Sequence, residues 1–150
     1  NEFPYMFDVA EVFVSVAGGA PYYEFELTPL DQILEVRIFY ATQPQPGAPP
    51  KKSFQNGIDI GLEHKVSRSP GGWTADLGIP LERIGWQGDP AMITGDAHVI
   101  LGQGHVRRYF SRSLPAQAKP HFHLPEYFKP LLCEPAAHEE KRDQAAPLDC

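Results

Sequence analysis

Residues 22–28 read Tyr-Tyr-Glu-Phe-Glu-Leu-Thr, and this strict alternation places Tyr22, Glu24 and Glu26 on one face of an extended chain. The intervening aromatic and aliphatic side chains point the other way. A period of two is typical of a half-buried strand, so the stretch predicts one. Residues 8–15 become β-branched and aromatic just before a pair of glycines, which predicts a preceding strand joined by a short connection.

Further strands are expected wherever apolar and β-branched residues lie between turn signals. These segments are 33–40, 58–66, 73–79, 98–110 and 127–133, where 98–110 is either one long strand with a bend at Gly102-Gln103-Gly104 or two short strands, 98–101 and 105–110. Residues 81–84 follow a proline and can form one helical turn. Residues 41–52 hold four prolines and almost no apolar side chains, which predicts an exposed excursion. Six or seven short strands with regular turns indicate an all-β fold, an antiparallel β-sandwich of jelly-roll or immunoglobulin-like type.

The 150 residues are enough for one hydrophobic core. Residues 1–133 are therefore predicted to form a single domain, and the polar residues 134–150, which have no periodic apolar face, a flexible tail. A disulfide between Cys133 and Cys150 would tie this tail to the last predicted strand. The spacing alone leaves that pairing open.

The net charge of −6 comes with no basic cluster larger than two adjacent residues, at Lys51-Lys52 and Arg107-Arg108. Proteins that bind nucleic acid need a concentrated positive face, so a nucleic-acid partner is not expected. No stretch approaches the ~20 consecutive apolar residues of a membrane helix, so no membrane partner is expected either. Any export signal is expected to have been removed or to lie outside the chain.

Four blocks, taken in order, resemble the family-nine-like carbohydrate-binding domains. They are residues 8–14, 22–30 (Tyr-Tyr-Glu-Phe-Glu-Leu-Thr-Pro-Leu), 72–81 (Gly-Trp to Ile-Pro-Leu) and 122–128 (Phe-His-Leu-Pro-Glu-Tyr-Phe). The resemblance covers about residues 8–133. It implies a β-sandwich that binds a saccharide by stacking aromatic rings on the pyranose and holding its hydroxyls with polar side chains. It also implies an extracellular or periplasmic location.

Members of this family have two or three strands before the first of these blocks, whereas only residues 1–7 precede it here. The resemblance therefore implies an unpaired sheet edge or an open flank of the core. We expect the chain to form a homodimer, to accept a strand from a partner, or to be a fragment of a longer protein.

Relatives with the same sandwich carry a b-type haem held by a Met with a His or Lys, and others dock proteins. For the haem alternative, the candidate ligands are Met6 or Met92 with His98 or His105. The sequence does not place such a pair across a cavity, so carbohydrate binding is the first prediction and no cofactor is assigned.

Five residues are the predicted ligand contacts. Trp86 lies in the loop Gly85-Trp86-Gln87-Gly88, where its ring is either a stacking platform or a lid over the core. Trp73 begins a predicted strand and is favoured as a core residue. Tyr22 and Glu24 offer a ring and an acceptor on one face, although a solvated outer face is favoured. Arg108 can donate to hydroxyls or pair with an acid.

An enzyme is not predicted. Asp8 and Glu11 lie three residues apart on a strand, hence on opposite faces, so they cannot act together on a glycosidic bond. No nucleophile elbow, phosphate loop or dinucleotide motif is present. His121 and His123 have a spacing suited to metal binding but no third ligand is indicated, so no metal site is predicted and His123 is interpreted as structural.

Overall fold

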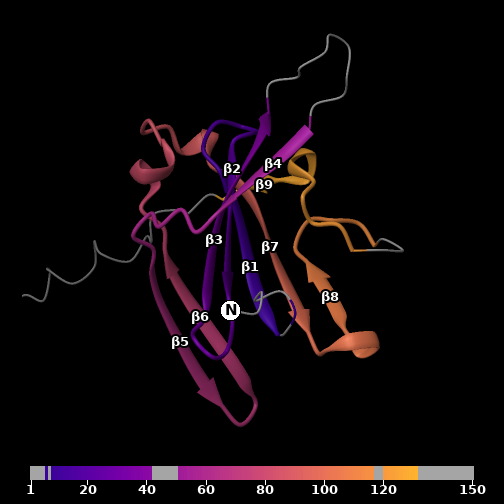
Figure 1. Ribbon diagram of the computed structural model, residues 1–150. Helices are drawn as coiled ribbons and strands as arrows, with labels where there is room; N and C mark the ends of the chain where they lie inside the picture. The colour runs from indigo at the N-terminus through magenta and orange to yellow at the C-terminus, as the bar shows by residue number, and fades with distance from the viewer. Residues whose placement is uncertain (1–5, 7, 42–50, 117–119, 132–150) are drawn as a thin grey trace, which may run out of the picture.

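The computed structural model describes residue 6 and residues 8–41, 51–116 and 120–131 (Figure 1). The described part contains antiparallel strands, four short 3-10 helices and no α-helix. The strands are β1 Val9–Ser15, β2 Tyr22–Leu27, β3 Ile33–Ala41, β4 Lys51–Asn56, β5 Glu63–Ser69, β6 Gly72–Gly78, β7 Thr94–Leu101, β8 Arg108–Ser111 and β9 Lys129–Pro130. The 3-10 helices are η2 Leu81–Ile84, η3 Pro90–Met92, η4 Gly104–Val106 and η5 Pro125–Tyr127. The predicted all-β class is confirmed.

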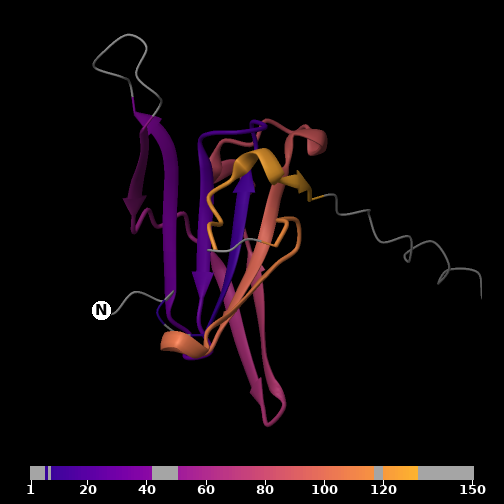
Figure 2. The ribbon, with the colours of Figure 1, turned by 90° about the vertical axis from the view of Figure 1, so that its right-hand side faces the viewer.

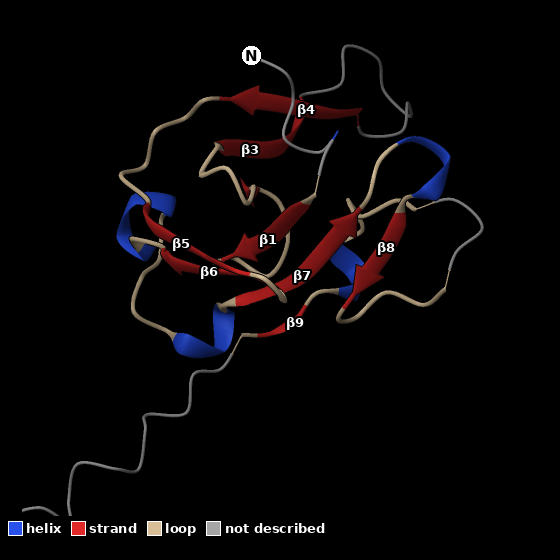
Figure 3. Cartoon of the chain, turned by 90° about the horizontal axis from the view of Figure 1, so that it is seen from below, coloured by secondary structure: helices blue, strands red, loops and turns tan. Residues whose placement is uncertain are grey.

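Seven strands form one sheet in the order β4-β3-β2-β1-β7-β8, with β9 also pairing with β7. All of these pairs are antiparallel. Strands β5 and β6 form a separate two-stranded sheet, a hairpin that extends past the large sheet (Figure 2). Viewed from below, β4 and β8 lie at the two outer sides of the large sheet (Figure 3). The arrangement of two sheets as layers of a sandwich stays a prediction.

Both faces of the large sheet are covered. On one face Val14, Tyr23 and Phe25 pack with Ile60 and Ile84, which come from the segment before β5 and from η2. The other face carries a second cluster, formed by Phe13, Tyr22, Val36 and Ile38 with Phe122 and Phe128 packed against it. Successive residues of β1 and β2 therefore enter two different clusters. Strand β2 is consequently buried along its whole length, and the prediction of a half-buried strand was wrong.

Several predicted boundaries also differ from the structure. Residues 51–56 form edge strand β4, although 51 and 52 were expected in the exposed excursion. The strand expected at 58–66 begins at Glu63, because Ile58, Ile60 and Leu62 pack on the large sheet from an irregular segment. Strand β7 begins earlier than expected, and the strand expected at 127–133 is reduced to β9 within the described residues.

The predicted helical turn at 81–84 is confirmed as η2. Residues 132–150, including Cys133 and Cys150, lie outside the described residues, as does most of the excursion. No helix in the described part of the chain has both the length and the apolar character needed to cross a membrane. Strand exchange with a partner at an edge stays a prediction.

Among the described glycines, Gly95 of β7 leaves the least room for a side chain. A methyl group at this position would lie 2.0 Å from the Phe13 carbonyl oxygen and 2.6 Å from Leu131 Cδ1. Because the first contact is with backbone, we expect Gly95→Ala to lower the free energy of unfolding by about 1–3 kcal/mol or more. At Gly71 the same methyl group would meet nothing within 4 Å, so Gly71→Ala should cause no loss. Denaturant unfolding curves of equal midpoint for the two variants would contradict this packing.

Candidate functional site

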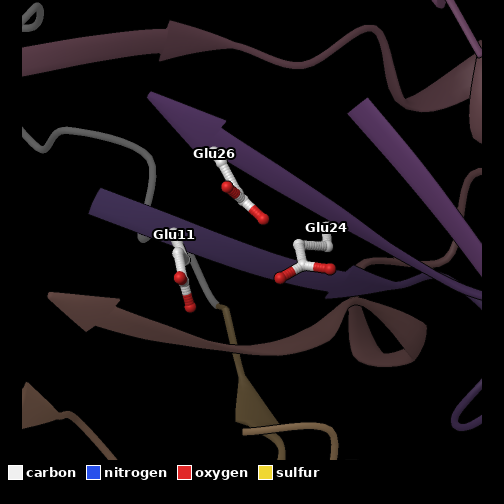
Figure 4. A group of neighbouring side chains, drawn as sticks. All are labelled: Glu11, Glu24 and Glu26. Atoms are coloured by element: carbon white, nitrogen blue, oxygen red, sulfur yellow. The ribbon is translucent and has the colours of Figure 1, made fainter. Parts of the chain in front are cut away.

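Three glutamates gather on one face of the large sheet. Glu11 of β1 lies opposite Glu26 of β2, and Glu24 lies opposite Phe13, so all three carboxyl side chains leave the sheet on the same side (Figure 4). His98 of β7 lies opposite Glu11 from the other neighbouring strand and shares this face. The antiparallel register therefore brings together acidic side chains that lie far apart in sequence.

These carboxyl groups are almost completely buried. Glu11, Glu24 and Glu26 are 3%, 6% and 3% exposed, and one oxygen of each lies within 4.8 Å of the others. Burial, with a smaller contribution from the charge of Glu26, raises the pKa of Glu11 to about 8, although Arg107 opposes the shift. Burial and the charges of Glu26 and Glu11 raise the pKa of Glu24 to about 9. At neutral pH both groups hold a proton and can donate a hydrogen bond.

The face was expected to be solvated, and that prediction was wrong. Tyr22 is fully buried, and its hydroxyl group lies 3.3 Å from Nδ1 of His123. Lys52 of β4 donates a hydrogen bond to the backbone carbonyl of His123, which connects the segment around His123 to β4. Residues 120–128 thus cover the face of β1 and β2 that the alternating sequence of β2 had predicted to be exposed to solvent. The structural role expected for His123 agrees with these contacts.

His98 lies inside this covered region. Its ring stacks on Phe122 at a centroid distance of 4.1 Å and meets Phe13 edge-on at 5.0 Å. Neither ring nitrogen has a hydrogen-bond partner among the described residues. Burial lowers the pKa of His98 to about 4, even though nearby Asp96 favours the charged form. The 3.7 Å approach of His98 Nε2 to Asp96 Oδ2 is therefore not an ion pair at neutral pH.

His123 is neutral for the same main reason, since burial and then the charge of Lys52 lower its pKa to about 4. Its Nε2 atom lies 3.9 Å from Glu24 Oε2, which is beyond hydrogen-bond distance. Because the imidazole and this carboxyl group are both uncharged at pH 7, their contact is dipolar rather than ionic.

A cavity of about 450 Å³ opens above the carboxyl groups. The three glutamates lie at its base on β1 and β2, and Leu34 and Val36 of β3 continue that surface. The remaining lining residues come from β4, β7, β8 and the covering segment: Phe54, Asn56, Ile100, Tyr109, Pro120, His121, Phe122 and His123. Phe54 and Tyr109 are 53% and 41% exposed, so their rings are accessible to a ligand. The cavity combines polar groups that form directional bonds with rings that offer flat apolar surfaces.

Of the five predicted ligand contacts, the structure brings Glu24 to the cavity, with Tyr22 buried beside it. The other three lie elsewhere. Trp86 follows η2 and donates its indole N–H to the Asp89 carbonyl oxygen at 3.1 Å. Trp73 lies in the β5–β6 hairpin opposite Arg68 and is partly buried. Arg108 is exposed on the edge strand β8.

Glu11 and the aromatic residues Phe54, Tyr109 and Phe122, which line the cavity, were not predicted as parts of one site. Glu11 was compared only with Asp8, whose carboxylate instead accepts a hydrogen bond from the Gly102 backbone at 2.5 Å. The sequence did contain one indication of this site: acidic residues occur within two adjacent, otherwise apolar strands, Glu11 in β1 and Glu24 and Glu26 in β2. In an antiparallel pair, such acids meet on one face if the register allows it.

The buried groups predict an unusual pH dependence of stability. In the unfolded chain the two carboxyl groups lose their protons near pH 4.5, but in the folded protein Glu11 and Glu24 hold them until about pH 8 and 9. Unfolding therefore releases protons in this window, and the free energy of unfolding falls as the pH rises. His98 and His123 act oppositely between about pH 4 and 6.5, because there the unfolded chain binds protons that the folded protein excludes.

We therefore expect a shallow dependence between pH 4.5 and 6.5, where the two effects oppose each other, and a loss of several kcal/mol between pH 6.5 and 9. The double variant Glu11→Gln/Glu24→Gln removes both titrating carboxyl groups and should flatten this alkaline limb. Urea unfolding at a series of pH values checks the expectation. A stability that is constant or rises over pH 6.5–9 in the unmodified protein would show that these carboxyl groups do not hold their protons.

No family model matches the chain, and neither the curated proteins nor the solved structures include a significant match.

Proposed function

We propose that the protein is a non-catalytic carbohydrate-binding module that holds a saccharide in the cavity above Glu11, Glu24 and Glu26. The observation that carries this proposal is the presence of buried carboxyl groups and accessible aromatic rings in one cavity. Its volume of about 450 Å³ lies in the range of small-molecule sites, and suits a mono- or disaccharide.

The chemistry of a sugar matches these two kinds of surface. The C–H face of a pyranose packs on an aromatic ring, and Tyr109 and Phe54 present partly exposed rings at the cavity wall. Sugar hydroxyls need partners that both donate and accept hydrogen bonds. A protonated carboxyl group does both, and Glu11 and Glu24 are in this form at neutral pH.

Aromatic truncation tests the location of the site. A glycan array first identifies a bound saccharide, and titration calorimetry then measures its affinity for variants. Tyr109→Ala and Phe54→Ala should each weaken binding about tenfold, the equivalent of one lost stacking contact. Both rings are partly exposed, so the variants should unfold at nearly the wild-type temperature.

Trp86→Ala is the matched control, because it removes a larger ring that does not line the cavity. Its affinity should equal that of the unmodified protein. Loss of binding in Trp86→Ala with normal binding in Tyr109→Ala and Phe54→Ala would place the site at the Gly85–Gly88 loop. Failure of every glycan on the array to bind would contradict the proposed function itself.

A further inference from the structure

Strand β8 ends the large sheet with an unpaired edge. It pairs with β7, and no strand of the described residues lies on its other side (Figure 3). The amide of Arg112 donates to the carbonyl of Ala97 at 3.0 Å. Because residues of an antiparallel strand alternate in direction, the backbone amide and carbonyl groups of Tyr109 and Ser111 point away from β7. Within the described residues these four groups make no hydrogen bond, so they can pair with an added strand.

A second cavity, of about 270 Å³, runs along this edge. Three consecutive residues of β8 line it, and because neighbouring strand residues point to opposite faces, a cavity that meets all three follows the edge of the strand. Its other wall is largely apolar and includes Leu114, Pro115, Ala116 and Phe122. Space for an apolar side chain beside unpaired backbone is typical of domains that bind an extended peptide as an additional strand.

The outer face of β8 carries two arginines. Arg108, Phe110 and Arg112 alternate along the chain with Tyr109 and Ser111, so their side chains leave the sheet on the side away from Tyr109. All three are exposed, and Phe110 is 50% exposed. Neither guanidinium group forms an ion pair with an acidic side chain of the described residues. An added strand with acidic residues four positions apart would place one of them opposite each arginine.

The same charges disfavour a second copy of this chain as the added strand. Antiparallel pairing of two β8 strands about Phe110 would set Arg108 of each copy opposite Arg112 of the other. Like charges directly opposite each other on one face of a sheet are destabilising. The charge of this edge therefore selects a strand that differs from β8 and is acidic.

We propose that the outer edge of β8 binds an extended acidic segment of another protein, which pairs with the backbone of Tyr109 and Ser111. On the cavity side the side chains of that segment are apolar, and one of them fills the 270 Å³ space. On the outer face two acidic side chains lie opposite Arg108 and Arg112. None of the three buried glutamates takes part, so binding at this edge does not require a bound saccharide.

Two synthetic peptides test this proposal. Acetyl-Thr-Glu-Leu-Thr-Leu-Glu-Thr-amide has the required pattern, and the matched peptide has lysine in place of both glutamates. Each is titrated into the full chain labelled with nitrogen-15, and the NMR shifts of the Tyr109 and Ser111 amides report pairing at the edge. We expect the acidic peptide to bind about tenfold more tightly than the lysine peptide, because two attractive charge pairs replace two repulsive ones. The difference should shrink at about 1 M salt.

Proline variants distinguish the two edges of the large sheet. Tyr109→Pro removes an amide that points away from β7, so it blocks the added strand and keeps the bonds to β7. Phe54→Pro is the matched control on edge strand β4, because the amide of Gly57 donates to Glu35 and that of Phe54 therefore points away from β3. Binding of the acidic peptide should be lost in Tyr109→Pro and persist in Phe54→Pro. Tyr109→Ala, which keeps the amide, should retain binding.

Arg108→Glu tests the charge of the outer face, and because Arg108 is exposed this variant serves even if Tyr109→Pro fails to fold in a thermal melt. Its preference should shift toward the lysine peptide. Equal affinities of the two peptides for the unmodified protein would overturn the pairing with the arginines. Loss of binding in Phe54→Pro alone would place the added strand at β4 and overturn the proposal, as would the absence of any amide shift at millimolar peptide.

Analytical ultracentrifugation examines the remaining occupant of this edge. We expect the unmodified protein to sediment as a monomer. A dimer that Tyr109→Pro dissociates would show that a second copy of the chain occupies the β8 edge, and the acidic partner would then be wrong.

Discussion

Strand β1 pairs with β2 on one side and with β7 on the other, and these two registers decide which side chains meet. Glu11 is brought beside Glu26 and His98, and Phe13 beside Glu24. One residue further along, Val12 and Val14 point to the opposite face and pack among apolar side chains. A shift of either register by one residue would exchange these two sets, so the cavity and the apolar core depend on the same backbone hydrogen bonds.

Apolar packing on one face of the large sheet offsets the free-energy cost of burying the three glutamates on the other face. Three carboxyl groups in mutual contact destabilise a fold when buried, and they lose this penalty only by holding protons or by meeting a cation. The cluster around Val14, Tyr23 and Phe25 supplies apolar burial that offsets it, without any contribution from the cavity. Ionisable groups with strongly raised pKa values in a cavity are typical of sites that bind or react, and a purely structural sheet would gain more from apolar residues there.

Local alternation predicted the central strands, and the structure confirms them with Tyr22, Glu24 and Glu26 on one face. What covers that face was not predictable from the strand itself, because Phe122, His123 and Phe128 come from about 100 residues further along the chain. The sequence of an alternating strand is the same whether its polar face is exposed to water or covered by another segment of the chain.

The remaining errors have the same non-local origin. Ile58, Ile60 and Leu62 alternate like a strand, but they pack on the large sheet from an irregular segment. Strand β4 has a polar sequence, Lys-Lys-Ser-Phe-Gln-Asn, and is held at an edge by backbone pairing with β3. Glu11 could be seen as a buried acid, yet its partners were set by register with β2 rather than by spacing from Asp8.

The cavity described above requires that the buried carboxyl groups of Glu11 and Glu24 hold protons at neutral pH. Carbon-13 NMR of protein labelled at the glutamate side-chain carboxyl carbon measures this directly, with Glu11→Gln and Glu24→Gln assigning the two resonances. We expect the carboxyl group of Glu11 to titrate near pH 8 and that of Glu24 near pH 9. If both resonances moved near pH 4.5 instead, the two carboxyl groups would be ionised at pH 7, which would contradict the protonated state described for the cavity.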